Sequence, residues 1–369
     1  MRILDLPRRS IPACIVVLSG QIAVEAASGW TQFDMKKADN RGRFLWTETA
    51  NWNTGRPQRE VSVEIGDDSS GRALHCVIPT GTKAQCLQFE LAEHGRTQGT
   101  TLRLEKGASL EVFGGATLSK DRESWFHVNG EFRCHSKRQG IRVGGPWGNP
   151  TANEPATCHL IIGPNGVVDA SFVGINTHYR AATVPSSPWG DRYWARSTGS
   201  EIIMNGGRLR AADGLRMSTT DATKPGALRM KENASFTSDR ESPTGVQIWC
   251  GIWELDGGGL NVQIGDLELH GNKFANEVSG KTGKAIGAGV SVLRWTGDRI
   301  STIKARKLNF VDAAEIDVSG LTVAPGTYRL LDGTKIIGDR LKLAARTDPA
   351  KWSLQVNRTE GDILIVRHR

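Results

Sequence analysis

Short runs of alternating apolar and polar residues fill the middle of this chain. Between Thr101 and Cys134 the alternation returns five times, and several runs are separated by a glycine or an Asn-Gly pair. Alternation with a period of two is typical of a strand with one buried face, and Gly or Asn-Gly allows the positive φ of a tight corner. The pattern therefore predicts many short strands that each turn one side toward a core.

Corner phrases of the same kind recur from about residue 60 to residue 320. They are Lys106-Gly107-Ala108, Asn129-Gly130, Asn165-Gly166, Asn205-Gly206, Glu232-Asn233-Ala234, Gly257-Gly258-Gly259 and Asp312-Ala313-Ala314. From Gly107 to Gly258 successive corners lie 23, 36, 40, 27 and 25 residues apart, as in coils of similar length of which some carry an insertion. We therefore expect an all-β fold, a single-stranded right-handed parallel β-helix (a β-solenoid). A pair of jelly rolls is the alternative, although a sandwich domain usually ends after about 100 residues.

The two ends of the chain carry short motifs of another kind. Near the start, Trp46 is followed by Asn51-Trp52-Asn53, Gly55 and Pro57. The closing phrases are Ala324 to Leu331, Ile337-Gly338, Trp352-Ser353-Leu354 and Ile363 to Val366. Both ends and the repeat style resemble exported, autotransporter-passenger-like β-helix proteins of planctomycetes and verrucomicrobia. The resemblance implies a parallel β-helix that is closed by hairpins. The chain departs from many such relatives, because we expect no C-terminal sorting helix or dockerin-like module in it.

We expect four parts along the chain. They are a signal peptide over residues 1–27, an N-terminal cap over 28–58, the parallel β-helix over 59–323 and C-terminal closing β-hairpins over 324–369. The open ends of a solenoid expose unpaired strand edges, so caps are needed at both ends.

The first residues indicate export. Arg2, Arg8 and Arg9 precede a short apolar run over residues 11–24, and Ala26 and Ala27 provide small residues for cleavage. A buried N-terminal strand is the alternative, since Gly20 and Gln21 weaken the apolar run. No later run reaches the ~20 apolar residues of a membrane helix. We therefore predict a secreted, extracellular or cell-surface protein without a transmembrane span.

Charge and cysteine content refine this expectation. The chain carries a formal charge of +8 and the mature chain about +7, which attracts an acidic polysaccharide or an anionic cell envelope rather than a specific nucleic acid. A solvated surface with a moderate excess of cations is the alternative.

The mature chain keeps Cys76, Cys86, Cys134, Cys158 and Cys250. Bridges between Cys76 and Cys86 or between Cys134 and Cys158 are possible, and an odd number leaves at least one thiol over.

Two insertions break the repeat and carry the candidate chemistry. One spans residues 144–157 and contains Trp147, and the other spans residues 176–200. The predicted ligand-binding residues are Trp147, Trp189, Tyr193, Trp194 and Arg196. Aromatic faces pack on sugar rings and guanidinium groups bind carboxylates, so stacked insertions would form a glycan-binding flank.

Catalysis is the rival interpretation of the same flank. Tyr179, His178, Arg180 and Arg192 are the candidate catalytic residues of a polysaccharide lyase or depolymerase, in which an arginine neutralises a uronate while Tyr or His removes a proton. In a third possibility, the insertion folds over its own aromatic residues. The protein is then a purely architectural passenger with no defined ligand. We favour a non-catalytic, carbohydrate-binding solenoid, and expect no cofactor.

Other motifs carry less chemistry. Carboxylate pairs at Asp67-Asp68 and at Asp239 and Glu241 lie near turns. The pairs His75-Cys76, Cys134-His135 and Cys158-His159 lack zinc spacing, and we expect Cys inward, His outward and no metal site. Trp249, Trp253 and Trp295 are expected in the core, and the first two would share one strand face if their strand is unbroken. An aromatic stripe on an exposed sheet face is the alternative.

Overall fold

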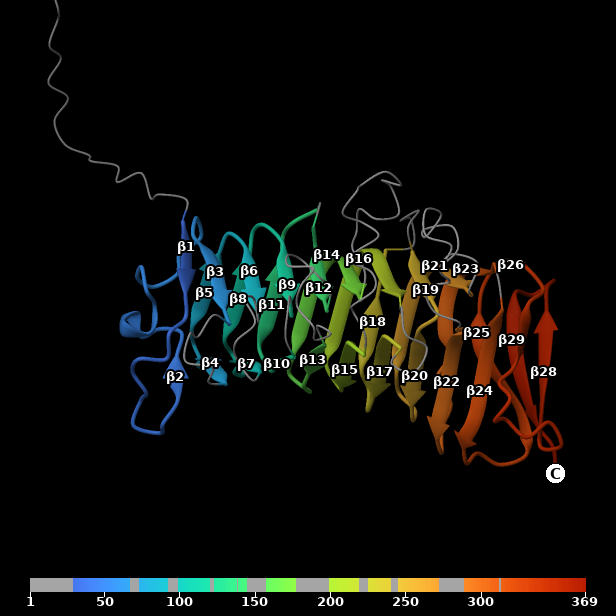
Figure 1. Cartoon of the computed structure of the whole chain (residues 1–369). Coiled ribbons are helices and arrows are strands. Elements are labelled where there is room, and N and C mark those ends of the chain that lie inside the picture. Colours follow the sequence, from blue (N-terminus) through green and yellow to red (C-terminus); the bar gives the residue numbers. More distant parts are fainter. Residues whose placement is uncertain are drawn as a thin grey trace, which may run out of the picture.

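The computed structural model describes residues 29–66, 73–91, 99–119, 123–137, 139–144, 157–176, 199–218, 225–239, 245–271, 289–311 and 313–369. These residues form a parallel β-solenoid, as predicted, whose coils follow one another from the blue N-terminal end to the red C-terminal end of Figure 1. Each coil turns through three strand positions, and each strand pairs in parallel with strands one coil before and one coil after it. The right-handed sense of the coil stays a prediction.

We call the three strand positions the first, second and third walls. The first wall is an 11-stranded sheet. Its strands are β2 (Phe44–Leu45), β4 (Leu74–Ile78), β7 (Thr100–Leu104), β10 (Ser124–Val128), β13 (Cys158–Ile162), β15 (Glu201–Asn205), β17 (Ala227–Lys231), β20 (Ile252–Asp256), β22 (Ser291–Gly297), β24 (Ala314–Leu321) and β27 (Leu341–Leu343).

The second and third walls belong to one 18-stranded sheet, because four long strands run around the corner between them. These four are β14 (Val167–Ile175), β16 (Arg208–Ser218), β21 (Asn261–His270) and β23 (Ile303–Phe310). The second wall also contains β5 (Lys83–Cys86), β8 (Ser109–Val112), β11 (Glu131–Cys134), β18 (Ser235–Thr237) and β25 (Gly326–Asp332). The third wall also contains β1 (Trp30–Gln32), β3 (Ser62–Ile65), β6 (Phe89–Leu91), β9 (Ala116–Leu118), β12 (Ile141–Val143), β19 (Val246–Trp249) and β26 (Ile336–Ile337).

The core is a set of apolar ladders inside the coils. On the first wall, inward side chains stack in register along the axis: Leu102, Phe126, Leu160, Ile202, Leu228, Trp253, Leu293 and Ile316. All of these side chains are buried. Because alternate residues of a strand face opposite sides, the polar residues between them face outward. The alternation in the sequence thus corresponds directly to the inside and outside of the coil.

Glycines at the corners are required by close approach between coils. A Cβ on Gly130 would lie 2.2 Å from the carbonyl oxygen of Ala108 in the preceding coil, and one on Gly166 would lie 2.2 Å from that of Val128. The six predicted corners from Gly107 to Gly259 all connect the first wall to the second. The seventh phrase lies at a different corner, since Ala314 begins β24, which follows a third-wall strand.

Aromatic residues cover the N-terminal coil. Trp46 and Trp52 make an edge-to-face contact at 4.8 Å between ring centroids, and Trp52 also contacts Phe33 at 5.0 Å. The indole N–H of Trp52 donates to the carbonyl oxygen of Trp46, so the polar atom of this buried ring is satisfied. The short 3₁₀-helix η1 (Thr49–Asn51) lies between the two tryptophans.

The C-terminal end changes from parallel to antiparallel pairing. Strand β29 (Asp362–Arg367) pairs antiparallel with β25 and with β28 (Trp352–Asn357). This hairpin follows the last coil in the red part of Figure 1. In the part of the chain that the structure describes, no helix is long and apolar enough to cross a membrane.

Candidate functional site

The predicted site residues lie outside the described residues. This holds for the ligand-binding set Trp147, Trp189, Tyr193, Trp194 and Arg196 and for the catalytic set His178, Tyr179, Arg180 and Arg192. The predicted signal peptide, Asp67, Asp68 and Glu241 lie outside them too. These assignments stay predictions.

The roots of the two insertions are nevertheless described, and they are adjacent. The first insertion leaves after β12 and the second after β14, and these strands pair in register through Val143 and Ile175. The insertions lead back into β13 and β15, which also pair. The hydroxyl of Ser200, at the end of the second insertion, accepts a hydrogen bond from the backbone N–H of Cys158 at 3.1 Å. Both insertions therefore start and end beside each other on one flank of the solenoid.

The outward side of the third wall carries a polar cluster around Glu268 on β21, three strands beyond β14. The Glu268 carboxylate accepts hydrogen bonds from Gln247 Nε2 at 2.9 Å and from Asn309 Nδ2 at 3.3 Å, and it lies 3.5 Å from His270 Nε2. The nearby His270 side chain is the largest cause that lowers the pKa of Glu268, to about 2, and hydrogen bonds from Gln247 and Asn309 add to it. A carboxylate with so low a pKa stays ionised at neutral pH and cannot act as a general acid there.

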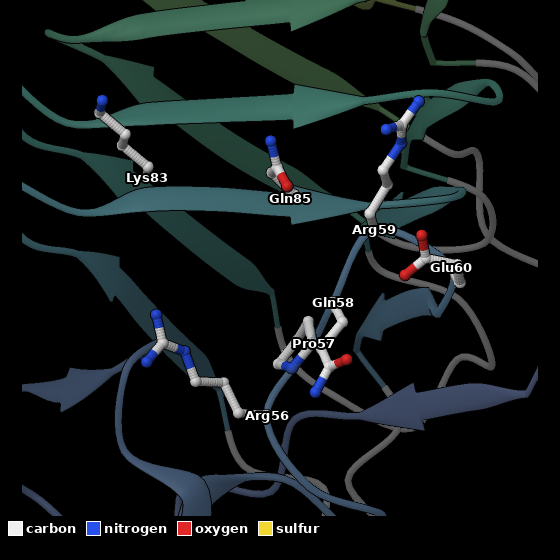
Figure 2. Close-up of a pocket in the computed structure, with 7 residues that line it drawn as sticks. All are labelled: Arg56, Pro57, Gln58, Arg59, Glu60, Lys83 and Gln85. Carbon is white, nitrogen blue, oxygen red and sulfur yellow. The ribbon is translucent and has the colours of Figure 1, made fainter. Parts of the chain in front are cut away.

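A second arrangement of charge is an open hollow of about 500 Å³ at the N-terminal coils (Figure 2). It is lined by Arg56, Pro57, Gln58, Arg59, Glu60, Lys83 and Gln85. Lys83 and Gln85 project outward from alternate positions of β5, and the other residues belong to the segment that leads from η1 into β3. Figure 2 shows Lys83 and Arg56 at one end and Arg59 with Glu60 at the other.

The cations of this hollow are not neutralised by ion pairs. No carboxylate in the described ranges lies within ion-pair distance of Arg56, Arg59 or Lys83. The guanidinium of Arg59 lies 4.2 Å from the centroid of the Phe113 ring, a cation–π contact that holds the arginine in place without neutralising it. The hollow is thus a cationic site with the volume of a small-molecule pocket.

Charges on the outside of the first wall neutralise one another instead. His159, Glu201, Arg229, Glu254, Arg294 and Asp317 form a chain of alternating charges along the axis. The distance between the side-chain nitrogen and the carboxylate oxygen in each of these ion pairs is between 2.7 and 3.0 Å. Because every charge already has opposite neighbours, this wall offers little to a charged ligand, and we assign it to stability.

The cysteines are structural. The described cysteines Cys76, Cys86, Cys134, Cys158 and Cys250 are all free and buried, so neither possible bridge forms. Burial raises the pKa of the Cys134 thiol to about 11 and that of Cys158 to about 12, and such thiols are unreactive. No group of residues in the described ranges could hold a metal ion.

The orientation predicted for the Cys-His pairs is confirmed. His75 and His135 are exposed and His159 is partly exposed, whereas the cysteine beside each is buried.

Asp239, a member of one of the carboxylate pairs in the sequence, forms an exposed ion pair in which its Oδ2 lies 3.3 Å from Arg210 Nη2.

All three tryptophans are buried, but only Trp253 and Trp295 lie in the core, and the strand between Trp249 and Trp253 is broken. Trp253 and Trp295 fill the core, and Trp249 is buried. Cys250 has a φ of 56° and ends β19, so Trp249 and Trp253 lie in different strands on different walls. Trp249 is not part of the contiguous core but lies on the outward side of the third wall.

The sequence interpretation missed the cationic hollow. Its arginines come from the phrase Arg56 to Glu60 and its lysine from a strand more than 20 residues later. The only signal was two arginines three residues apart, where the predicted N-terminal cap ends. A scan against protein-family models found no match, and searches of curated proteins and of solved structures found none either.

Proposed function

We propose that this protein is an exported, non-catalytic β-solenoid that binds an acidic polysaccharide at a cell surface or in the surrounding matrix. The observation that carries the proposal is the hollow with Arg56, Arg59 and Lys83, in which three cations meet one carboxylate side chain, Glu60. Guanidinium groups bind carboxylates through paired N–H donors, and the amides of Gln58 and Gln85 can bind hydroxyl groups.

The rigidity of the scaffold supports this proposal. Lys83 and Gln85 stand on β5, which pairs with β8 through four residues. A site on regular strands loses little conformational entropy when a ligand binds. The flank with the two insertions offers a further surface, and the predicted aromatic residues of those insertions would extend binding there.

The proposal is tested with native gels that contain polygalacturonate, alginate or a neutral galactan. We expect the wild-type protein to be retarded by the acidic polymers alone, and less strongly as salt screens the charges. The triple variant Arg56→Ser, Arg59→Ser, Lys83→Ser should lose about tenfold or more in affinity, because each charge-assisted hydrogen bond contributes ~1.5–3 kcal/mol.

A matched control removes the same net charge elsewhere. Lys335, Lys342 and Lys351 are exposed cations near the C-terminal end of the solenoid, and their triple substitution by Ser should leave retardation nearly unchanged. Equal losses in the two triple variants, or no retardation of the wild type by any acidic polymer, would contradict the proposed site. Incubation with the same polymers also tests the lyase alternative, since a lyase produces unsaturated uronate ends that absorb in the ultraviolet.

A further inference from the structure

The strand β5 lies at the N-terminal edge of the second wall, and one of its two sides has no neighbouring strand. On the other side β5 pairs with β8 of the following coil through four residues. In the preceding coil the chain passes the second wall as the segment 55–61, which forms neither a strand nor a β-bridge. Residues of this segment and of β5 line the hollow (Figure 2). The hollow therefore lies where a further strand of the second wall would stand.

The pairing with β8 determines where the backbone groups of β5 point. The N–H of Phe113 in the following coil donates to the carbonyl oxygen of Cys86 at 3.1 Å. In a parallel ladder the N–H and C=O of one residue point to the same side, and the next residue points to the opposite side. Cys86 points to β8, so Lys83 and Gln85 direct their N–H and C=O groups away from β8 and toward the hollow.

Leu87 confirms this direction, because it follows Lys83 and Gln85 at the same alternate spacing. Its N–H donates to the carbonyl oxygen of Val61 in the preceding coil at 2.9 Å. Among the described residues, no donor or acceptor meets the backbone N–H or C=O of Lys83 or Gln85 on that side. Unpaired groups at the edge of a sheet are a template for another strand. The hollow is thus lined by backbone donors and acceptors as well as by side chains.

The charge around this edge restricts which strand can pair with it. Lys83 stands on β5, and Arg56 and Arg59 stand on the facing segment. Glu60 is the one carboxylate side chain in the lining of the hollow. Lysine on an edge strand opposes pairing with a neutral or basic strand, whereas complementary charge selects an acidic one.

The spacing of the free backbone groups favours a polypeptide as the ligand. Alternate residues of a strand lie about 6.6–6.8 Å apart, so the free groups of Lys83 and Gln85 are separated by this distance. A second extended chain offers donors and acceptors at the same interval, and this match is the basis of peptide binding by strand addition. A chain of uronate sugars has no row of amide groups to match it.

We propose that the hollow is a strand-addition site, at which an acidic, extended segment of a partner protein pairs with β5. The backbone of the segment bonds with Lys83 and Gln85, and its acidic side chains lie beside Arg56, Arg59 and Lys83. This goes beyond polysaccharide binding and does not rest on it, because the partner is a polypeptide. The two ligands occupy the same hollow and exclude one another.

The test measures binding of a synthetic peptide to the full chain by fluorescence anisotropy. The probe is Val-Glu-Val-Glu-Val with blocked ends and an uncharged dye, and we expect the wild-type protein to bind it. The counterpart Val-Gln-Val-Gln-Val should bind at least about tenfold more weakly, because it lacks the charge-assisted hydrogen bonds. The acidic peptide with N-methylated backbone amides keeps every charge but loses its backbone donors, and it should also bind at least about tenfold more weakly.

Proline substitution then locates the binding on β5. Gln85→Pro removes an N–H that points into the hollow, and an edge strand tolerates proline where the N–H is outside the ladder. It should weaken binding of the acidic peptide by about tenfold or more. Gln85→Ala is the matched control, because it removes the side chain but keeps the N–H, and it should bind nearly as the wild type. Thermal unfolding verifies each fold, and Lys83→Pro compared with Lys83→Ser provides the result if Gln85→Pro does not fold.

The outcomes separate this proposal from the proposed function. Strand addition is overturned if the wild type does not bind the acidic peptide, if the N-methylated peptide binds equally well, or if Gln85→Pro binds like Gln85→Ala. Retardation of the wild type by polygalacturonate would in that case still support a glycan site in the hollow. Binding of the acidic peptide without retardation by any acidic polymer would support strand addition and contradict the proposed function.

Discussion

Replacement of Asp317 by Asn should destabilise the C-terminal coils. The Asp317 side chain is completely buried on the outer side of β24, and its Oδ2 accepts a hydrogen bond from Arg294 Nε at 2.8 Å. Arg346 also donates to Oδ2, and Ser319 donates to Oδ1 from both its N–H and its hydroxyl. Asp317→Asn preserves the shape but removes the charge that lies between two guanidinium groups.

The size of the effect follows from the surroundings of the two arginines. Breaking a buried ion pair by removing one partner costs about 3–5 kcal/mol. The Arg346 side chain is 51 % exposed and can regain water, whereas that of Arg294 is 18 % exposed and keeps its contact with Glu254 at 3.0 Å. We therefore expect the lower end of the range, about 3 kcal/mol, or roughly a hundredfold in the local opening equilibrium.

Hydrogen exchange is the appropriate assay, because each coil of a solenoid contacts only its neighbours. The backbone amides of β22, β24 and β27 should exchange about a hundredfold faster in the variant than in the wild type, because about 3 kcal/mol corresponds to that ratio of exchange rates. Amides of β7 and β10, many coils away, should remain as in the wild type. Glu315→Gln, in the same strand, is the control: Glu315 pairs with the exposed Lys342, so its loss should cost less than about 1 kcal/mol.

Acid dependence provides a second measurement on the same residue. Burial raises the pKa of Asp317, but hydrogen bonds from Arg346, Ser319 and Arg294 outweigh it and hold this pKa below its usual value. A group with a lowered pKa in the folded state stabilises the protein at neutral pH and loses that contribution as the pH falls through the folded pKa. Asp317→Asn should lack this part of the acid dependence. A change of less than about 1 kcal/mol at neutral pH, well below the cost of breaking a buried pair, would refute the reasoning.

Two further predictions concern the first wall. The hydrogen bond that His159 donates to Glu201 is the main cause that raises the pKa of His159, so its stabilising contribution should be fully present below about pH 6.5 and disappear as the pH rises through the folded pKa. His159→Gln should abolish this dependence in denaturant unfolding between pH 5 and pH 9, while an unchanged profile would show that the ion pair does not contribute. Phe126 is fully buried between Leu102 and Leu160, and Phe126→Ala should cost about 3–5 kcal/mol in the same assay. A loss below about 1 kcal/mol would mean that the coil does not pack as described.

The alternation of apolar and polar residues was sufficient to predict the strands, and the recurrence of corner phrases from about residue 60 to residue 320 predicted the solenoid. Whether a side chain faces in or out of a strand is a local property with a period of two, so the sequence contained it directly. The corner at Gly130 was predictable for a similar reason, since glycine and asparagine mark turns. The inward cysteines and outward histidines followed from the same alternation.

The corner after Trp249 shows where local reasoning ends. The phrase from Val246 to Leu255 contains apolar residues throughout, and it gave no sign that Cys250 would take a positive φ and separate two walls. The conformation of Cys250 depends on contacts with the neighbouring coils. One example is the hydrogen bond that its N–H donates to the hydroxyl of Ser291, 41 residues later.

Register between coils was decided only by the tertiary structure. Arg142, Gly174 and Arg216 align on neighbouring strands of the third wall although they are separated by 32 and 42 residues, since the intervening coils carry insertions of different lengths. Arg56, Arg59 and Lys83 likewise meet only when the segment before β3 lies against β5, one strand position away. Periodicity assigns each residue to the inside or the outside of its own strand. The length of each coil then decides which outward residues become neighbours, and that length depends on how every insertion leaves and rejoins the stack.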